Sequence, residues 1–296
     1  MGLKVEGIIP AMVTPMDKNQ EIDAEGMKAV INYLIDAGVH GIFVSGSQGE
    51  ACVLTDEEKK KIIKLTVDEV NGRVPVYAGT GAISTRDVIR MSRYAADVGA
   101  DAVSIVTPYY ISPSQEELYW HYRRIAEAVD IPVLLYNNPS RTNVNLEGET
   151  VRKLAQLDNV VGIKDSSGDL TLTAEYIRSC PDSFSVLAGR DSLILATLLY
   201  GGKGAIAATA NIAPKLVTSI YENYMRGNLE KARESQLRLL RLRLAFKLGT
   251  FPIVVKEAMN LLGRPAGPTR SPVAPLSEEK RGDLKALLID LGLLHP

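Results

Sequence analysis

The sequence has few of the residues that form disulfides and metal sites. Its 296 residues include two cysteines, Cys52 and Cys180, and three histidines, His40, His121 and His295. The cysteines lack the spacing of a redox or metal motif, and the histidines are scattered along the chain. We therefore expect a cytoplasmic protein in a reducing compartment, with no disulfide framework and no bound metal.

An excess of charge of one sign is also absent, and so are long apolar runs. The 34 basic and 35 acidic residues give a formal net charge of -1, so the basic surface that attracts nucleic acids or acidic lipids is not expected. No run approaches the roughly 18 apolar residues of a membrane span. Residues 1–15 also lack the apolar stretch of a secretory signal. We expect neither a nucleic-acid partner nor a membrane segment.

The chain instead contains short apolar runs that alternate with longer amphipathic stretches. The runs are rich in Val, Ile and Ala without strict alternation, which is typical of parallel strands buried on both faces. They begin at Gly7, Gly41, Val74, Asp101, Pro132, Val160, Phe184 and Gly204. Helical patterns lie between them, for example after the expected N-caps Asp23 and Thr55. Eight such alternations predict an α/β fold, the (β/α)₈ TIM barrel.

An open, doubly wound sheet is the alternative fold. That fold needs a glycine-rich phosphate turn after the first strand, and residues 11–15 read AMVTP instead. Beyond the eighth strand, helical stretches begin near Leu229, Phe251 and Ser277, which is more than a barrel requires. We predict a barrel over residues 1–225 and a C-terminal three-helix appendage over residues 226–296.

Lys164 is the first candidate for chemistry. The active site of such a barrel lies at the C-terminal ends of the strands, where polar side chains converge. Lys164 directly follows the apolar run that begins at Val160, so its stem is expected to point into the barrel. Burial would lower the pKa of its amine, and a neutral amine can form a Schiff base. The alternative is a lysine that reaches solvent from the end of a strand.

Tyrosines follow the two preceding strands. Tyr136 ends the fifth run, and Tyr109 and Tyr110 follow the fourth. A phenol can relay protons to a reacting group, although a single tyrosine is more often an aromatic packing residue. Tyrosines at successive strand ends beside the lysine strand favour the catalytic interpretation.

Two further features suit the binding of carboxylates. The backbone amides of the turn 46–50 and the hydroxyl of Ser47 are groups that can cradle a carboxylate, although a single glycine-rich turn is a weak signal. Glu50 in that turn is either an acid–base group or a buried anchor for the loop. Arg141 can clamp a second carboxylate through two hydrogen bonds, or it can form an ordinary surface ion pair.

Five spaced motifs resemble one known family. They are GSQGE (46–50), VTPYY (106–110), LYNNPSRT (135–142), GIKDSSG (162–168) and GGKGAIAATAN (201–211). In this order they resemble the dihydrodipicolinate synthase/N-acetylneuraminate lyase family of pyruvate-dependent class I aldolases, and the resemblance covers nearly the whole chain. It implies a (β/α)₈ barrel with C-terminal helices, a homotetramer, and no cofactor beyond the covalent imine between lysine and pyruvate.

The resemblance also implies catalytic roles for individual residues. Lys164 is similar to the Schiff-base lysine of the family, and Tyr136 to its proton-shuttling tyrosine. Ser47 stands where a Thr or Ser links that tyrosine to a second one, here Tyr110, from a neighbouring subunit. Tyr109 is placed at the same interface.

Substrate-binding roles follow in the same way. Gln48 stands in place of the usual second Thr or Ser at the pyruvate carboxylate, and the carbonyl of Ile206 is placed near the pyruvyl group. Gly189 at the end of the seventh strand is placed with them. Arg141 matches the arginine that grips the carboxylate of the aldehyde substrate.

Arg141 favours one branch of the family. That branch condenses pyruvate with L-aspartate 4-semialdehyde to 4-hydroxy-tetrahydrodipicolinate, for lysine and diaminopimelate biosynthesis. Asn138, Asn143 and Arg190 depart from its pattern. The alternative is therefore an aldolase for 2-oxo acids such as 2-keto-3-deoxygluconate or 4-hydroxy-2-oxoglutarate.

The lysine-feedback pocket of some family members is poorly matched. Ile83 cannot supply the amide of the usual Asn, so we predict weak or absent inhibition by lysine. The positions concerned are Ala51, Cys52, Asp56, Lys59, Ile83 and Asp87.

Three other functions remain as alternatives. The first is a metal-dependent aldolase or hydrolase, which the scattered histidines disfavour. The second is a glycosidase with paired carboxylates such as Glu50 and Asp165, in which Lys164 would have no task. The third is a barrel that only senses a 2-oxo acid, and the presence of Lys164, Tyr136 and Tyr110 argues against it.

Overall fold

The computed structural model describes residues 3–295 of the chain and contains one parallel sheet of eight strands. The strands are β1 (Gly7–Pro10), β2 (Ile42–Val44), β3 (Val76–Gly79), β4 (Ala102–Val106), β5 (Val133–Asn137), β6 (Val160–Asp165), β7 (Ser185–Ala188) and β8 (Gly204–Ala207). Their order is β1-β8-β7-β6-β5-β4-β3-β2, and a parallel bridge between Ala11 and Phe43 joins the two ends. The predicted (β/α)₈ barrel is confirmed, and the open-sheet alternative is wrong.

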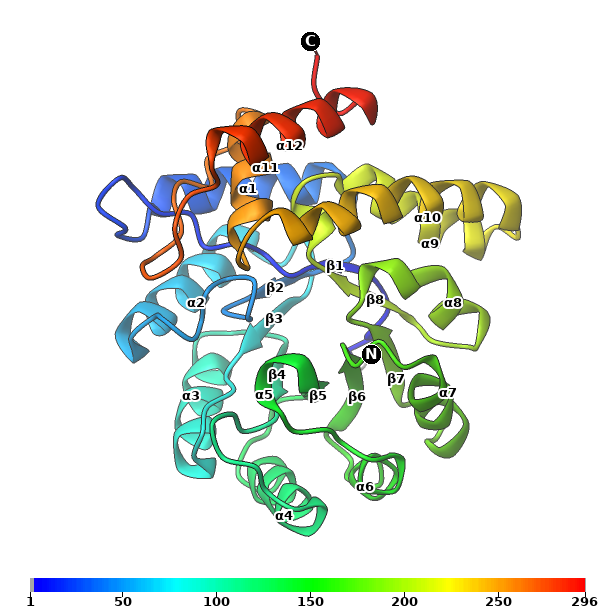
Figure 1. The fold of residues 1–296 in the computed structure, drawn as a ribbon. Coiled ribbons are helices and arrows are strands. Elements are labelled where there is room, and N and C mark those ends of the chain that lie inside the picture. Colours follow the sequence, from blue (N-terminus) through cyan, green and yellow to red (C-terminus); the bar gives the residue numbers. More distant parts are fainter. Residues whose placement is uncertain (1–2, 296) are drawn as a thin grey trace.

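Helices surround this barrel (Figure 1). Those that follow the eight strands are α1 (Ala24–Asp36), α2 (Asp56–Val70), α3 (Thr85–Asp97), α4 (Gln115–Ala126), α6 (Gly148–Leu154), α7 (Leu170–Ser179), α8 (Ile194–Leu199) and α9 (Pro214–Met225). The predicted caps account for where several of them begin. The Asp23 carboxylate accepts from the Gly26 N–H at 2.9 Å, and Thr55 forms a capping box with Glu58.

Short helices occupy the loops at the strand ends. They are α5 (Pro139–Thr142) and the 3₁₀ turns η1 (Asp191–Leu193), η2 (Thr209–Asn211) and η3 (Ala245–Leu248). Figure 1 shows α5 across the mouth of the barrel. The Thr107 hydroxyl donates to the Thr142 hydroxyl at 2.8 Å, which fixes α5 to the end of β4. Arg141 is held at the mouth for this reason.

The alternation of side chains along the strands separates two packed layers. Ile9 and Leu134 belong to the cluster inside the barrel, whereas Ile8 and Leu135 pack between the strands and the helices. On β5 this alternation turns Tyr136 inward, because it lies two residues beyond Leu134.

The C-terminal helices are α10 (Leu229–Leu244), α11 (Ile253–Leu261) and α12 (Glu278–Asp290). They lie together at one side of the barrel, and α10 runs beside α9 (Figure 1). Their starts agree with the predicted positions, while the division at residues 225 and 226 stays a prediction. None of the helices within residues 3–295 is long and apolar enough to cross a bilayer.

Candidate active site

Lys164 and Tyr136 are neighbours on adjacent strands at the mouth of the barrel. They are register partners in the β5–β6 pair, and each side chain is 4% exposed. Lys164 Nζ lies 4.1 Å from the centroid of the Tyr136 ring and 5.0 Å from that of Phe43. The alternative of a lysine that reaches bulk water is therefore wrong. The amine is enclosed by aromatic rings and lies within reach of a phenol.

The Tyr136 phenol is surrounded by hydrogen-bonding groups. Asn138 Nδ2 donates to its oxygen at 2.8 Å. Burial alone raises the pKa of the phenol, but the Lys164 ammonium and the hydroxyls of Ser47 and Ser166 outweigh burial and hold the pKa below its ordinary value. This phenol exchanges its proton more readily than an ordinary tyrosine does.

The loop 45–50 brings Ser47 and Gln48 to the same place. Ser45 and Glu50, at its two ends, have positive φ angles of 57° and 61°. The Thr14 hydroxyl donates to the Gly49 carbonyl at 2.7 Å and fixes the turn. Gln48 is 3% exposed, and neither polar atom of its side-chain amide has a partner among residues 3–295. Buried amides without partners are rare, and this one lines the cavity beside Lys164.

Glu50 is the anchor of this loop. Its Oε1 accepts from Lys256 Nζ at 2.7 Å, and its Oε2 accepts from the Arg270 N–H at 2.8 Å. Lys256 lies on α11, is 0% exposed and also donates to the Thr14 carbonyl at 2.9 Å. Lys256 was not among the predicted residues, although a lysine within the apolar run PIVVKEAM is a signal for a buried ion pair.

A cavity of about 110 Å³ lies at the mouth of the barrel. The predicted residues that line it are Lys164, Tyr136, Ser47, Gln48, Arg141, Gly189 and Ile206. A neighbouring cavity of about 260 Å³ shares Ser47, Tyr136 and Arg141 with it and is lined by Tyr109 as well. Tyr110 lines neither cavity and is 95% exposed. Within one chain, seven of the nine predicted residues therefore surround a single cavity.

Gly189 has a steric reason to be glycine. A Cβ atom there would lie 2.1 Å from Ser166 Oγ and 2.8 Å from the Asp165 carbonyl. The close approach of the ends of β6 and β7 thus excludes a side chain at this position.

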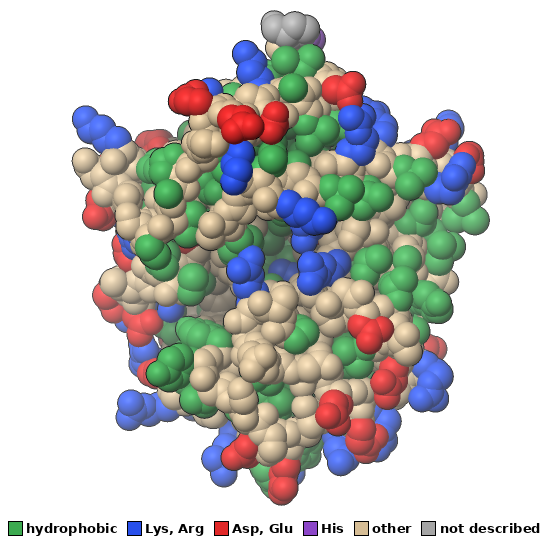
Figure 2. Space-filling view, viewed as in Figure 1, with side chains coloured by type: hydrophobic (Ala, Val, Ile, Leu, Met, Phe, Trp, Pro, Cys, Tyr) green, Lys and Arg blue, Asp and Glu red, His purple; other side chains and the backbone are tan. Residues whose placement is uncertain are grey.

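Two arginines that were given no substrate role join Arg141 at the mouth. Arg190 follows β7 and Arg243 belongs to α10, and both line the 110 Å³ cavity. Figure 2 shows Lys and Arg side chains around the central hollow of this face, with Asp and Glu side chains farther out. Burial and the positive charges of Arg190 and Arg141 lower the pKa of Arg243, and only Asp191 opposes this effect.

Each of the three guanidinium groups has a defined position. The Arg141 guanidinium lies 4.4 Å from the centroid of the Phe251 ring. The Arg243 guanidinium lies 4.8 Å from the centroid of the Phe246 ring. Arg190 Nε donates to the Ser166 carbonyl at 3.1 Å. Within residues 3–295 no carboxylate lies within 4.0 Å of any of these arginines. The surface ion pair considered for Arg141 is therefore wrong.

The two carboxylates considered for a glycosidase are occupied elsewhere. Asp165 accepts from the Thr173 hydroxyl at 2.6 Å and from the Ser167 N–H at 2.9 Å. Glu50 is paired with Lys256, and neither carboxylate lines the cavity beside Lys164. Paired carboxylates that flank a bond are thus missing from this site. Across residues 3–295 no cluster of three or more His, Cys, Asp or Glu side chains is arranged to hold a metal ion.

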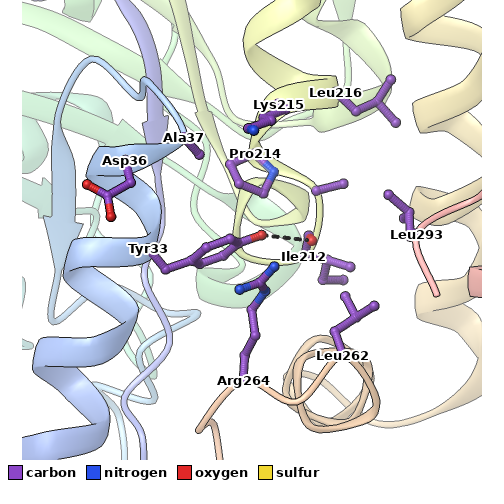
Figure 3. A pocket seen from close by; sticks show the side chains of 11 residues that line it. Tyr33, Asp36, Ala37, Ile212, Pro214, Lys215, Leu216, Leu262, Arg264 and Leu293 are labelled. Carbon is purple, nitrogen blue, oxygen red and sulfur yellow. Dashed lines mark hydrogen bonds between the residues drawn. The ribbon is translucent and has the colours of Figure 1, made fainter. Parts of the chain in front are cut away.

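A larger cavity of about 330 Å³ lies on the flank of the barrel. Figure 3 shows Arg264 beside Tyr33, whose hydroxyl donates to the Ile212 carbonyl at 3.2 Å. The Arg264 guanidinium lies 3.4 Å from the centroid of the Tyr33 ring. None of the predicted site residues reaches this cavity, so the candidate active site is the mouth of the barrel.

Comparisons with known proteins agree with this geometry. The sequence matches the dihydrodipicolinate synthetase family over residues 4–291. It is 45% identical over 296 residues to the 4-hydroxy-tetrahydrodipicolinate synthase of Methanopyrus kandleri, covering 99% of both chains. A crystal structure of dihydrodipicolinate synthase has a TM-score of 0.94 at 44% identity and covers 98% of this chain and 100% of its own. YagE of E. coli K12, a prophage protein of the dihydrodipicolinic acid synthase family solved with pyruvate, has a TM-score of 0.96 at 36% identity, covering 99% and 100%.

Proposed function

We propose the function of this chain from one premise, namely that it belongs to the dihydrodipicolinate synthetase family. The chain is a pyruvate-dependent lyase that condenses pyruvate with L-aspartate 4-semialdehyde to 4-hydroxy-tetrahydrodipicolinate, in lysine and diaminopimelate biosynthesis. The observation that carries this proposal is the buried Lys164 amine, 4.1 Å from the ring centroid of Tyr136 at the end of a barrel strand.

The first half of the reaction takes place on Lys164. Its neutral amine attacks the ketone carbon of pyruvate, and loss of water gives the imine. Tyr136 supplies the proton that the departing oxygen needs, and its neighbours favour this donation because they lower the pKa of the phenol. The phenolate then takes up a proton again. The iminium then acts as an electron sink, so that the methyl group loses a proton and an enamine forms. No cofactor other than the covalent imine is required.

Pyruvate is held by the loop at the end of β2 and by the rim of the cavity. The unpartnered amide of Gln48 and the backbone N–H groups of the turn 46–48 bind its carboxylate. Ile206 lines the cavity, and its carbonyl is assigned to the vicinity of the pyruvyl group, where Gly189 leaves room. This assignment gives Gln48 the partners that it lacks within the protein.

The second half of the reaction joins the aldehyde to the enamine. The enamine carbon attacks the aldehyde carbon while the Arg141 guanidinium binds the aldehyde's carboxylate through two N–H groups. The amine of aspartate semialdehyde then displaces Lys164 as the ring closes. The Arg141 guanidinium, which lies 4.4 Å from the centroid of the Phe251 ring and has no carboxylate partner among residues 3–295, suits this task.

The site is completed by a second subunit. Tyr110 is 95% exposed, and its φ of 74° is unusual for a bulky residue. This conformation directs an aromatic side chain away from its own chain, and we assign it to the cavity beside Ser47 of a neighbouring copy. Tyr109 lies at the same interface.

A second group of exposed apolar side chains supports a homotetramer. These residues lie on α8, the turn after it and α10, far in sequence from the loops that carry Tyr110. They are Leu199, Tyr200, Leu237 and Leu244. Exposed apolar groups of this kind mark contact surfaces. We place the assembly in the cytoplasm, in line with two cysteines that form no disulfide.

The direct test is turnover of purified protein with pyruvate and L-aspartate 4-semialdehyde. Consumption of both substrates, followed by a coupled reductase that acts on the cyclised product, is the expected result. The alternative function is a 2-oxo-acid aldolase, which Arg190 in place of an acidic residue favours. Cleavage of 2-keto-3-deoxygluconate or 4-hydroxy-2-oxoglutarate, without any condensation with aspartate semialdehyde, would establish the alternative instead.

A further inference from the structure

The cavity on the flank of the barrel is built by segments that are distant in sequence. It lies between the end of α1, the start of α9 and the residues that follow α11 and α12, and its volume is about 330 Å³ (Figure 3). Cavities that bind small molecules have volumes from about 300 Å³ upward. None of the residues that line it also lines the cavity beside Lys164. A ligand on the flank therefore does not compete with pyruvate.

Most of the wall of this cavity is apolar. Leu216 belongs to α9, Leu262 ends α11, and Leu293 follows α12. Figure 3 shows the three leucines together on one side of the cavity. Each packs against the hydrophobic core but is still partly exposed. An aliphatic chain that covers them removes apolar surface from water, which favours binding.

Arg264 adds a positive charge to the same cavity. Its guanidinium lies 3.4 Å from the centroid of the Tyr33 ring, and its Nε is buried without a hydrogen-bond partner among residues 3–295. No described carboxylate lies within 4.0 Å of it. Buried polar atoms are nearly always hydrogen-bonded, and buried charges are paired. The missing partner points to an anionic ligand.

The start of α9 favours an anion as well. This helix begins at Pro214 in the wall of the cavity, and its N-cap Ala213 supplies no side-chain hydrogen bond. The N-terminus of a helix carries a partial positive charge that attracts anions. Lys215 is a second cation in the lining. The acidic residue of the lining, Asp36, directs its carboxylate away from Arg264 in Figure 3.

We propose that the flank cavity binds a small aliphatic monocarboxylate, with its carboxylate on Arg264 and its chain against the three leucines. A carboxylate offers two acceptor oxygens to the guanidinium donors. An inorganic anion leaves the leucines uncovered, and an uncharged aliphatic molecule leaves Arg264 unpaired. Only a ligand with both parts matches the whole lining. The proposal does not depend on the imine at Lys164.

The test uses hexanoate as the probe, because it has no ketone and cannot form an imine. Its binding to the purified protein is measured by isothermal titration calorimetry, with and without saturating pyruvate. Each CH₂ group buried against the wall strengthens binding about 4-fold, so Kd falls from acetate through butanoate to hexanoate. Hexan-1-ol has the chain without the charge, and it binds about 10-fold more weakly than hexanoate.

Three variants separate the charge from the apolar wall. Arg264→Gln weakens the binding of hexanoate about 10-fold and leaves that of hexan-1-ol unchanged. Leu293→Ala weakens the binding of both ligands about 4-fold. Arg226→Gln is the matched control at the other end of α9, where Arg226 pairs with Glu222 of the same helix, and it changes neither affinity. Thermal melting shows that each variant is folded.

Four results overturn the proposal. They are no binding of hexanoate, equal affinity for hexanoate and hexan-1-ol, an affinity for hexanoate that a folded Arg264→Gln variant retains, and binding that disappears when pyruvate is added. The last result places hexanoate at the mouth of the barrel instead of the flank. None of these results bears on the imine at Lys164, so this proposal and the proposed function fail separately.

Discussion

The Tyr136 phenol illustrates how single residues set the chemistry of this site. It is buried, which disfavours the phenolate, yet an ammonium and two hydroxyls beside it hold its pKa below the ordinary value. A phenol that donates a proton in the rate-determining step loses this ability as the pH rises through its pKa. The alkaline limb of kcat/KM for pyruvate is therefore expected below the ordinary pKa of tyrosine.

Ser47→Ala tests this explanation at the level of one hydrogen bond. Removing the hydroxyl takes away one of the groups that lower the pKa of Tyr136, so that pKa rises and the alkaline limb moves to higher pH. The rate at neutral pH falls about 10- to 100-fold, because the proton relay is impaired. Ser179→Ala, at the end of α7, is the control and leaves the profile unchanged. An alkaline limb that stays in place in Ser47→Ala contradicts the assignment.

Free L-lysine is expected to inhibit the enzyme weakly or not at all. Ile83 stands where the lysine-feedback pocket of some family members has an Asn amide. Its side chain is 42% exposed and offers no polar group. Asp56 and Asp87, which fall in the same pocket, both pair with Arg90. A titration of the initial rate with L-lysine checks this, and clear inhibition by sub-millimolar lysine would refute it.

The predicted residues that line the cavity share one property, which is that they end strands or follow them directly. Lys164 and Tyr136 could be chosen from the sequence because the ends of parallel strands meet at one rim. Arg243, Phe251 and Lys256 come from the C-terminal region instead. Their contact with the mouth depends on how that region packs against the barrel, which no local pattern in the sequence specifies.

At the scale of elements, α11 supports the loop that carries Ser47. Lys256 on α11 is fully buried and pairs with Glu50 at the end of that loop at 2.7 Å. Burial lowers the pKa of Lys256, and the carboxylate of Glu50 opposes this effect. The ion pair joins two segments 206 residues apart, so loop geometry and C-terminal packing are coupled.

Lys256→Met is expected to destabilise the protein by about 3–5 kcal/mol, because it leaves the Glu50 carboxylate buried without its partner. Urea denaturation measures this loss. In the double variant Glu50→Gln/Lys256→Met most of the stability returns, since no charge remains uncompensated. A single variant as stable as the parent, or a double variant less stable than Lys256→Met, contradicts the role of the pair.

Helix starts were predicted better than the short helices at the rim. The expected caps Asp23 and Thr55 each cap a helix in the way that their residue type favours. The four-residue α5 was not predicted, because a single turn lacks the periodicity that reveals a longer helix. It nevertheless carries Arg141, the arginine that we propose binds the aldehyde.

For the molecule as a whole, the proposed function implies that one chain does not contain a complete site. Tyr110 is 95% exposed, and by the assignment above it acts in the cavity of a neighbouring copy. Tyr110→Ala is therefore expected to lower kcat about 100-fold while leaving Lys164 able to bind pyruvate.

Mixing two inactive variants tests this arrangement. Lys164→Arg and Tyr110→Ala subunits, exchanged into hybrid oligomers, form some sites with both an intact Lys164 and an intact Tyr110. Activity that rises above the sum of the two separate variants is the expected result. Mixtures without any gain, although mass spectrometry detects hybrid oligomers, would place Tyr110 outside the site.

The proposed function depends above all on an imine between Lys164 and pyruvate. Treating the protein with borohydride in the presence of pyruvate, followed by peptide mass spectrometry, measures this directly. We expect a stable reduced adduct on the peptide that carries Lys164, and none in a folded Lys164→Arg variant. An adduct on another lysine, or none in the parent protein, would contradict the account.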